Sequence, residues 1–291
     1  MPKANPLYQH TNRIELVRDA RQGWPSRRGG DRKIAARAAL ARALWAADGS
    51  RRVPLEHTLD AVLGGLRRGE LDWICEFSPL GPLYLLPTSR WIRVLATSIR
   101  ELGAKRVLEV AAGDGFLSRA LREVAPDLHI IASDSGRWEN PTARMTAEER
   151  RALAGRDVPG LALGDQVVRL EAREAIRKYR PDLVLASWLP PGRLLDQLIR
   201  SKVRHVLEIG AAGGVTASQW SWRFNHEFCE GPIEKLARCR LDARPGKELH
   251  TRVTLYFGAA HKEYFCERVR PEDWLWQFRP TSPSVERAGN G

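Results

Sequence analysis

One stretch of the chain constrains its fold more than any other: a short apolar segment that ends in a turn of small residues and continues into a helix. The segment and its turn read Lys105-Arg106-Val107-Leu108-Glu109-Val110-Ala111-Ala112-Gly113-Asp114-Gly115. An amphipathic pattern follows directly over 116–124. Residues with no side chain, or with only a methyl group, allow unusual dihedral angles and let a ligand approach the backbone. The pattern predicts the first parallel strand of an α/β fold, with a nucleotide-like ligand at the helix N-terminus.

The spacing of the small residues bears on three interpretations. The stretch can be an ordinary strand, turn and helix of any α/β protein. A dinucleotide-binding fold is a second interpretation, but its G-x-G-x-x-G spacing is absent. The third is that Glu109-Val110-Ala111-Ala112-Gly113-Asp114-Gly115 resembles the E-x-G-x-G-x-G signature of class I S-adenosylmethionine-dependent methyltransferases. Ala111 stands where this family usually has its first glycine.

The resemblance implies a fold, a cofactor and a set of contacts. The fold is a Rossmann-like, seven-stranded, mostly parallel sheet with helices on both faces, and the cofactor is S-adenosyl-L-methionine. In this sequence the residues that would contact the cofactor at the turn are Glu109, Ala111, Gly113, Asp114 and Gly115.

An acidic residue is expected where the second strand ends. The apolar segment 128–134 ends at Asp134, about 20 residues beyond the glycine turn, and a carboxylate there can accept hydrogen bonds from both ribose hydroxyls. A cap or turn aspartate is the alternative. Trp138 follows closely, and its ring either covers the adenine or fills a gap between loop and core.

Two further strands carry the other candidate residues. The strand at 166–170 ends at Glu171, which in the family's pattern lies beside the adenine amino group. The strand at 181–187 ends at Ser187 and is followed by Trp188. We take these two residues as the acceptor-side, catalytic candidates. The following Leu-Pro-Pro-Gly is not the Asp/Asn-Pro-Pro-aromatic tetrapeptide of amino-group methyltransferases, so that specificity does not carry over. Weaker acceptor-side candidates are Tyr84, His226, Trp220 and Trp222.

A second run of small residues competes with the first. It follows the strand predicted at 203–209 and reads Glu208-Ile209-Gly210-Ala211-Ala212-Gly213-Gly214. No strand that ends in an acid follows it at the required distance, whereas four further strands follow the first run. We therefore assign the cofactor to the first run and a turn near the substrate entrance to the second. The segments 233–241 and 252–257 are expected to form the antiparallel hairpin at the sheet edge.

Charge is concentrated near the N-terminus. The net charge is +12, and residues 1–52 hold twelve Lys and Arg against four Asp and Glu. Such a surplus suits a nucleic acid or another acidic partner. Only eight of the 47 basic residues are lysine, so arginine supplies most of the positive charge. An excess of arginine is equally expected from a GC-rich genome, because arginine codons follow base composition.

The sequence as a whole predicts that the chain has three parts. Residues 1–87 form a basic helical extension with helices at 31–47 and 55–68, 88–258 the methyltransferase core, and 259–291 a C-terminal extension with a frayed tail. Thr88 and Ser89 cap a helix that stops at Gly103, and a capping box opens another at 146–153. No signal peptide, membrane span, C-x-x-C pair or metal-binding cluster stands out, so we expect a cytoplasmic protein with reduced cysteines.

Three functions are compatible with these features. The favoured one is a methyltransferase that acts on a small molecule by in-line displacement, because the sulfonium is already an activated leaving group and alignment supplies most of the catalysis. The second is a nucleic-acid (RNA) methyltransferase that uses the basic N-terminus. The third is a binding protein that has kept the fold without the chemistry.

Overall fold

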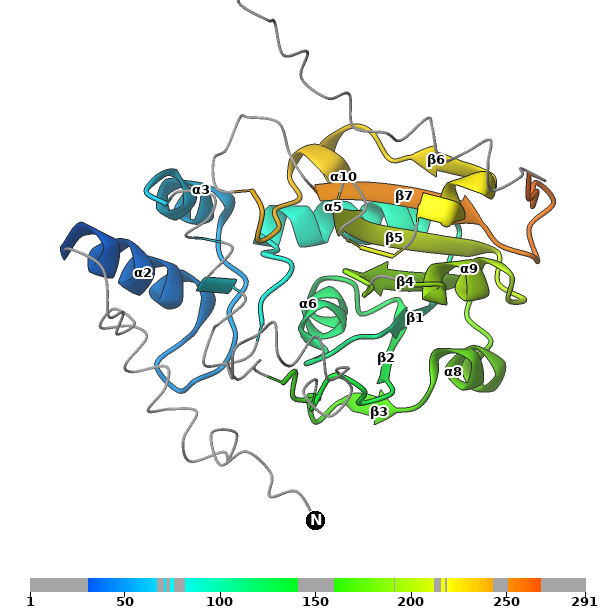
Figure 1. The fold of residues 1–291 in the computed structure, drawn as a ribbon, viewed down its shortest axis with the longest axis horizontal. Coiled ribbons are helices and arrows are strands. Elements are labelled where there is room, and N and C mark those ends of the chain that lie inside the picture. Colours follow the sequence, from blue (N-terminus) through cyan, green and yellow to red (C-terminus); the bar gives the residue numbers. More distant parts are fainter. Residues whose placement is uncertain are drawn as a thin grey trace, which may run out of the picture.

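The protein is built on one mixed sheet flanked by helices (Figure 1). A computed structural model describes residues 31–66, 71, 74–75, 82–140, 160–190, 192–211, 216–217, 219–242 and 251–267. Seven strands lie in the order β3-β2-β1-β4-β5-β7-β6, with β7 antiparallel to both of its neighbours. The strands are β1 Arg106–Val110, β2 His129–Asp134, β3 Val167–Arg169, β4 Leu183–Ser187, β5 His205–Ala211, β6 His226–Phe228 and β7 Thr251–Phe257. This confirms the seven-stranded, mostly parallel α/β fold expected from the sequence.

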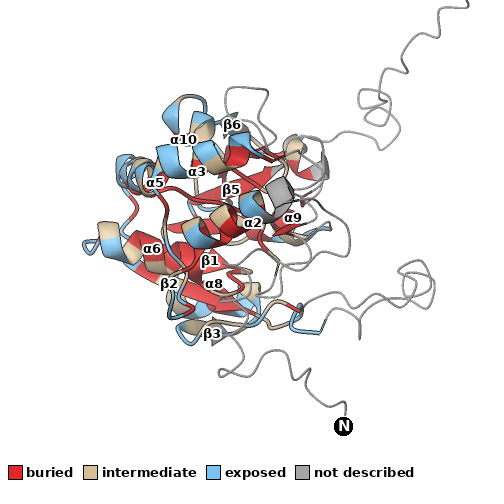
Figure 2. Ribbon diagram, turned by 90° about the vertical axis from the view of Figure 1, so that its left-hand side faces the viewer, coloured by how far each residue is buried: buried red, intermediate tan, exposed pale blue. Residues whose placement is uncertain are grey.

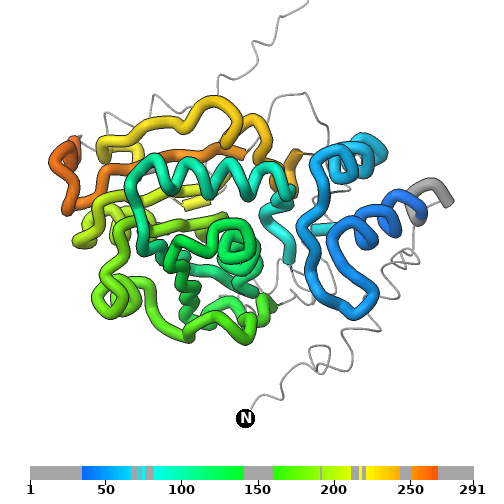
Figure 3. Tube along the Cα trace, turned by 180° about the vertical axis from the view of Figure 1, so that it is seen from behind, coloured from blue at the N-terminus to red at the C-terminus, as the bar shows by residue number. Residues whose placement is uncertain are grey.

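Helices cover both faces of the sheet, and Figure 2 shows most of the sheet as buried. One face packs against α5 (Ser89–Glu101), α6 (Phe116–Val124) and α10 (Pro232–Lys235). Figure 3 shows α5 and α6 in front of the strands on that side. The other face packs against α8 (Ala172–Tyr179), α9 (Leu194–Ile199) and the 3-10 helix η3 (Gln219–Arg223).

The helix that precedes the first strand begins as predicted. The Thr88 side chain accepts a hydrogen bond from the Trp91 amide at 3.2 Å, and α5 starts at Ser89. Trp91 is fully buried, and its indole donates to the Ile233 carbonyl at 2.7 Å. Capping and burial together hold α5 against the sheet.

The antiparallel hairpin differs from the prediction. The segment 233–241 is not a strand, because Pro232 follows Gly231 and starts the short helix α10. The partner of β7 is instead β6, in which His226 pairs with Tyr256. Its three residues are too few to show the alternation that identifies a strand. The helix predicted at 146–153 lies outside the described residues.

The N-terminal extension has a hydrophobic core of its own. Helices α2 (Asp31–Leu44) and α3 (Glu56–Gly64) pack together beside the sheet, as Figures 1 and 3 show from opposite sides. Both are shorter than predicted, since the chain turns after Leu44 and again after Gly64. We call residues 31–87 the N-terminal module. Its core consists of Leu40, Ala41, Leu44, Trp45, Leu59, Leu63, Leu66, Leu71, Ile74, Cys75, Leu83 and Leu86. The division of the chain at residue 87 stays a prediction.

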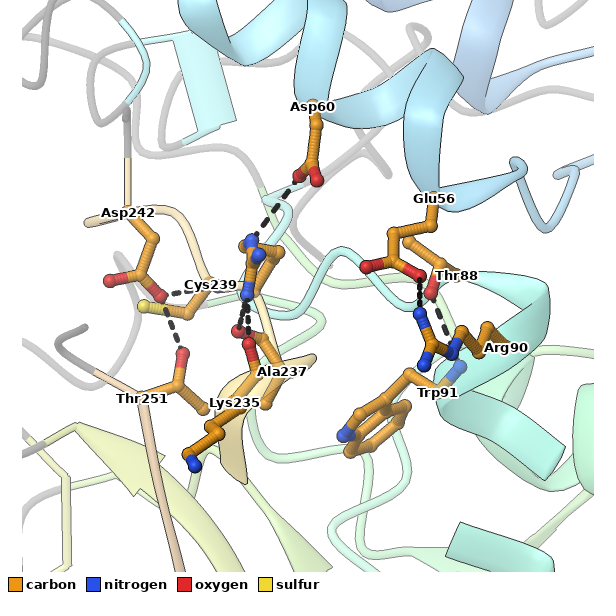
Figure 4. A network of polar contacts seen from close by, with 11 residues as sticks. Glu56, Asp60, Thr88, Arg90, Trp91, Lys235, Ala237, Cys239, Asp242 and Thr251 are labelled. Atoms are coloured by element: carbon orange, nitrogen blue, oxygen red, sulfur yellow. Dashed lines mark hydrogen bonds and ion pairs between the residues drawn. The ribbon is translucent and has the colours of Figure 1, made fainter. Parts of the chain in front are cut away.

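Polar contacts fasten the module to the core. Figure 4 shows Glu56 and Asp60 on α3 facing polar groups of the core. Asp60 pairs with the buried Arg238 at 3.4 Å, and Glu56 pairs with Arg90 at 3.0 Å. The Leu86 amide donates to the Arg238 carbonyl at 2.9 Å. The module is thus anchored both at the segment that follows α10 and at the first turn of α5.

None of the helices in the described ranges is long and apolar enough to span a membrane.

Candidate cofactor and acceptor site

The turn after β1 reverses the chain within a few residues. Ala111, Gly113 and Gly115 have φ angles of 51°, 57° and 69°, all in the left-handed region. Glycine adopts this conformation freely, whereas alanine does so at a cost of about 1 kcal/mol. The turn therefore keeps the geometry of a glycine turn even where Ala111 replaces the glycine. Gly115 is the N-cap of α6.

Glu109 links β1 to the helix that follows. Its carboxylate is buried and accepts hydrogen bonds from the Ser118 amide at 3.0 Å and the Ser118 hydroxyl at 2.5 Å. Burial raises the pKa of Glu109 to about 7, against the lowering effect of these hydrogen bonds. Glu109 therefore positions α6, and part of its surface also lines the cavity described below.

Asp134 lies at the carboxyl end of β2, as the sequence predicts. It is 7% exposed, and its two oxygens accept hydrogen bonds from the Gly113 amide at 3.0 Å and the Gly136 amide at 2.8 Å. Each carboxylate oxygen has a second lone pair that can still accept a hydrogen bond. The acid of the second strand and the turn of the first are thus joined directly.

Asp114 connects the turn to the N-terminal module. One oxygen accepts from the Phe116 amide at 3.1 Å, and the other pairs with Nη1 of Arg51 at 2.9 Å. The Arg51 guanidinium lies over the Phe116 ring, 3.8 Å from its centroid. Nothing in the sequence around Arg51 indicates this role, because its partners are remote in the chain.

A cavity of about 210 Å³ runs along this edge of the sheet. Its lining combines residues on the turn and after β2 with residues after β4 and residues of the module. They meet because β1, β2 and β4 are parallel neighbours whose carboxyl ends share one edge. The lining residues are Arg51, Pro82, Tyr84, Leu85, Pro87, Glu109, Ala111, Ala112, Gly113, Asp114, Phe116, Leu117, Asp134, Trp138, Leu161, Ser187, Trp188, Leu189 and Pro190.

The end of the cavity beside β4 is aromatic. Trp188 has a φ of 55°, and its amide donates to the Ile209 carbonyl at 2.7 Å. Its ring stacks on the Tyr84 ring with centroids 6.0 Å apart and an interplanar angle of 20°. The Arg240 guanidinium lies on Tyr84 as well, 5.6 Å from its centroid. Ser187, Trp188 and Tyr84, named from the sequence as acceptor-side candidates, thus line one cavity.

The opposite end is formed by Trp138 and Leu161. Trp138 is 44% exposed, and its carbonyl accepts from the Leu161 amide at 2.8 Å. A Cβ added to Gly113 would lie 2.6 Å from a Leu161 methyl, so a larger residue at this position would have to displace the Leu161 side chain. Leu161 belongs to a long connection without strong periodicity, so its position could not be inferred from the sequence.

Other candidate residues lie away from the cavity lining. Glu171 caps α8 without a side-chain hydrogen bond and pairs with Arg137 at 3.0 Å on an exposed surface. His226 lies on the edge strand β6, with Nδ1 2.8 Å from the Phe224 carbonyl. Trp222 packs against Phe228, with ring centroids 6.4 Å apart. The roles predicted for Glu171 and Gly115 in cofactor binding stay predictions.

In the second run of small residues, the described part from Glu208 to Ala211 is not among the residues that line the cavity. Glu208 is buried, and its carboxylate accepts from the Thr216 hydroxyl at 3.3 Å. Burial raises its pKa to about 7. Residues 212–214 of this run lie outside the described residues. Within the described ranges, no group of His, Cys, Asp and Glu side chains could hold a metal ion.

The strand order, the left-handed turn after β1 and the acid after β2 define the fold class of the protein. The chain has a Rossmann-like α/β fold similar to that of class I S-adenosylmethionine-dependent methyltransferases. No protein-family model matches it. A segment of 110 residues, 37% of this chain, is 32% identical to the release factor glutamine methyltransferase of Deinococcus radiodurans and spans 35% of that protein.

Solved structures with similar folds include several methyltransferases. The 23S rRNA methyltransferase ErmE is 16% identical over 58% of this chain and 68% of its own, with a TM-score of 0.31. The plantazolicin methyltransferase BpumL, solved in complex with SAH, is 9% identical over 58% and 83%, with a TM-score of 0.31. The ribosomal protein L11 methylase from Lactobacillus delbrueckii subsp. bulgaricus is 15% identical over 57% and 77%, with a TM-score of 0.29. Scores of this size carry no argument about substrate.

Proposed function

We propose that the protein is an S-adenosyl-L-methionine-dependent methyltransferase that acts on a small-molecule acceptor. The observation that supports the proposal is one cavity whose lining includes both Gly113 and Asp134, after β1 and β2, and Ser187 and Trp188, after β4. A nucleoside cofactor and its acceptor must share one enclosed space, because displacement requires nucleophile, methyl and sulfur in line. Such alignment is worth about 7–11 kcal/mol of the barrier.

The side chains at the nucleoside end fit the cofactor. Asp134 keeps lone pairs for the ribose hydroxyls while it holds the turn through Gly113. Trp138 and Leu161 offer apolar surface for a purine ring. When bound, S-adenosyl-L-methionine supplies an activated methyl group, so the protein needs no nucleophile of its own. The site residues have to bind, orient and exclude water.

The acceptor end favours a compact, flat molecule. Tyr84 and Trp188 form an aromatic wall, and Pro82 and Pro87 narrow the same end from the module side. Ser187 lies at the carboxyl end of β4, and its hydroxyl group can orient a polar group of the acceptor by hydrogen bonding. We assign Trp188 to stacking against the acceptor and Ser187 to its orientation.

Cofactor binding is tested by calorimetry with S-adenosyl-L-methionine and S-adenosylhomocysteine. Ligand at 100 times its Kd should stabilise the wild type by about 2.7 kcal/mol. Asp134→Ala should weaken binding at least about tenfold, because the ribose loses charge-assisted hydrogen bonds. Asp127→Ala removes an exposed carboxylate on the same domain and should bind as the wild type does. If the wild-type protein binds neither ligand, the remaining interpretation is the binding protein that has kept the fold without the chemistry.

The acceptor class is tested with methyl-labelled cofactor. Label should enter the small-molecule fraction of a cell extract rather than its RNA or protein. The basic N-terminus motivates the RNA alternative, for which affinity would fall about one log unit per log unit of salt for each phosphate neutralised. Label in RNA together with such a salt dependence would replace the small-molecule proposal with the RNA one.

A further inference from the structure

We propose that Arg51 binds the carboxylate at the amino-acid end of S-adenosyl-L-methionine, so that the N-terminal module completes the cofactor site. The inference rests on the proposed function and assigns a side chain of the module to the amino-acid end of the cofactor. It requires that Arg51 is fixed in place, faces the cavity and has donors left for a ligand.

The backbone around Arg51 is held from both sides. Arg51 follows α2 and pairs with Trp45 in an isolated antiparallel bridge. The next amide, of Arg52, donates to the Leu44 carbonyl at 2.8 Å. On the core side, Nη2 of Arg119 on α6 donates to the Arg51 carbonyl at 3.1 Å. The module therefore presents Arg51 to the turn at a defined position.

The guanidinium lies in the cavity wall with part of its donor set in use. The side chain is 11% exposed, and Nη1 pairs with Asp114. Nε is buried and has no hydrogen-bond partner among the described residues. The Nε and Nη2 groups form the edge of a guanidinium that a carboxylate contacts through two parallel hydrogen bonds. A buried donor without a partner is costly, so this edge is suited to an anionic ligand group.

The charges around the cavity support the same assignment. Its described lining contains two carboxylates, on Asp114 and Asp134, the carboxyl group of Glu109, whose pKa burial raises to about 7, and one cation, on Arg51. These carboxylates favour a positively charged ligand but repel a ligand carboxylate. Arg51 offsets that repulsion beside Asp114. The cofactor combines a sulfonium and an ammonium with a carboxylate, and therefore requires both kinds of partner.

A purely structural role is the competing explanation, in which Arg51 only holds Asp114 and the turn. The two roles separate with a matched pair of ligands, S-adenosyl-L-methionine and its decarboxylated form. Both have the nucleoside, the sulfonium and the amine, and they differ by the carboxylate alone. Titration calorimetry would measure both ligands on the wild type and on Arg51→Met, Arg51→Lys, Asp114→Asn and Arg52→Met.

We expect the wild type to prefer the intact cofactor by about tenfold or more. Arg51→Met should abolish that preference by weakening the intact cofactor alone, and Arg51→Lys should keep part of it through its charge. Asp114→Asn should keep the preference, because Arg51 is still present. Arg52 is the exposed neighbour, and its variant should behave as the wild type.

Three results would overturn the inference. One is a wild type that binds both ligands equally, and another is an Arg51→Met variant that weakens both by the same factor. The third is an Asp114→Asn variant that loses the preference, which would assign the effect to the turn. If circular dichroism shows that Arg51→Met fails to fold, the test uses Arg51→Lys instead. The quantity compared is again the ratio of the affinities for the intact and the decarboxylated cofactor. Wild-type protein that binds neither ligand refutes the proposed function instead, so the two failures are distinguishable.

Discussion

The ring of Tyr84 stacks on the ring of Trp188 across the junction between the N-terminal module and the sheet. Tyr84 precedes the helix α5, whereas Trp188 follows strand β4, so neither belongs to an element that dictates the other's position. Both line the cavity. This aromatic wall of the cavity exists only because the module is docked in this place.

The stack should contribute to stability as well as to binding. We expect a coupling energy of about 0.5–1.5 kcal/mol between Tyr84→Ala and Trp188→Ala, the range for aromatic pairs beyond the area they bury. Urea unfolding of both single variants and of the double variant gives this value. Additive effects would show that the rings do not interact.

Replacing Ala111 by glycine should stabilise the protein. Its φ of 51° strains an alanine, and glycine relieves that strain by up to about 1 kcal/mol. Ala112 is the matched control, because its φ is not positive and its replacement by glycine should destabilise by about 0.5–1 kcal/mol. Thermal unfolding should therefore show opposite signs at adjacent positions. A stability change of the same sign at both positions would show that Ala111 is not strained.

Stability should fall as the pH rises through neutrality. The pKa of Glu109 is raised to about 7 from 4.5, so its proton binds more tightly in the folded state. The contribution of this group is complete below pH 4.5 and is lost as the pH rises through about 7, by roughly 3 kcal/mol in all.

Glu109→Gln tests this dependence. The amide carbonyl can still accept from Ser118 but carries no titrating proton. The variant should unfold at a higher denaturant concentration than the wild type at about pH 8, and its free energy of unfolding should vary less between pH 5 and pH 8. Glu208 adds the same trend, so some slope is expected to persist. A variant with the wild-type slope would disprove the raised pKa of Glu109.

The two ion pairs between module and core should differ in strength. Arg238 is 7% exposed, whereas Arg90 is 63% exposed. Asp60→Ala leaves a buried guanidinium with fewer partners and should cost about 1–3 kcal/mol. Glu56→Ala breaks the exposed pair and should cost less than about 1 kcal/mol. Urea unfolding of the two variants compares them directly, and equal costs would contradict the role of burial.

Local patterns made the turn after β1 and the acid after β2 predictable. The apolar run, the small-residue turn and the helix after it are set by residues close in sequence, and Asp134 follows from the length of one helix and one strand. Periodicity and dihedral preference act over a few residues, so the sequence contains them. The antiparallel hairpin was predicted wrongly, because β6 has three residues and is too short to show an alternating pattern.

What the chain determined by itself was therefore the order of the parallel strands β1 to β5, the reversal at Gly113 and the acid at the end of β2. Only the tertiary structure decided that Arg51 reaches Asp114, that Tyr84 faces Trp188 and that Glu171 lies on an exposed surface. Arg51 and Asp114 are 63 residues apart. Contacts of that kind depend on how two hydrophobic cores pack against each other, and no short stretch of sequence encodes that packing.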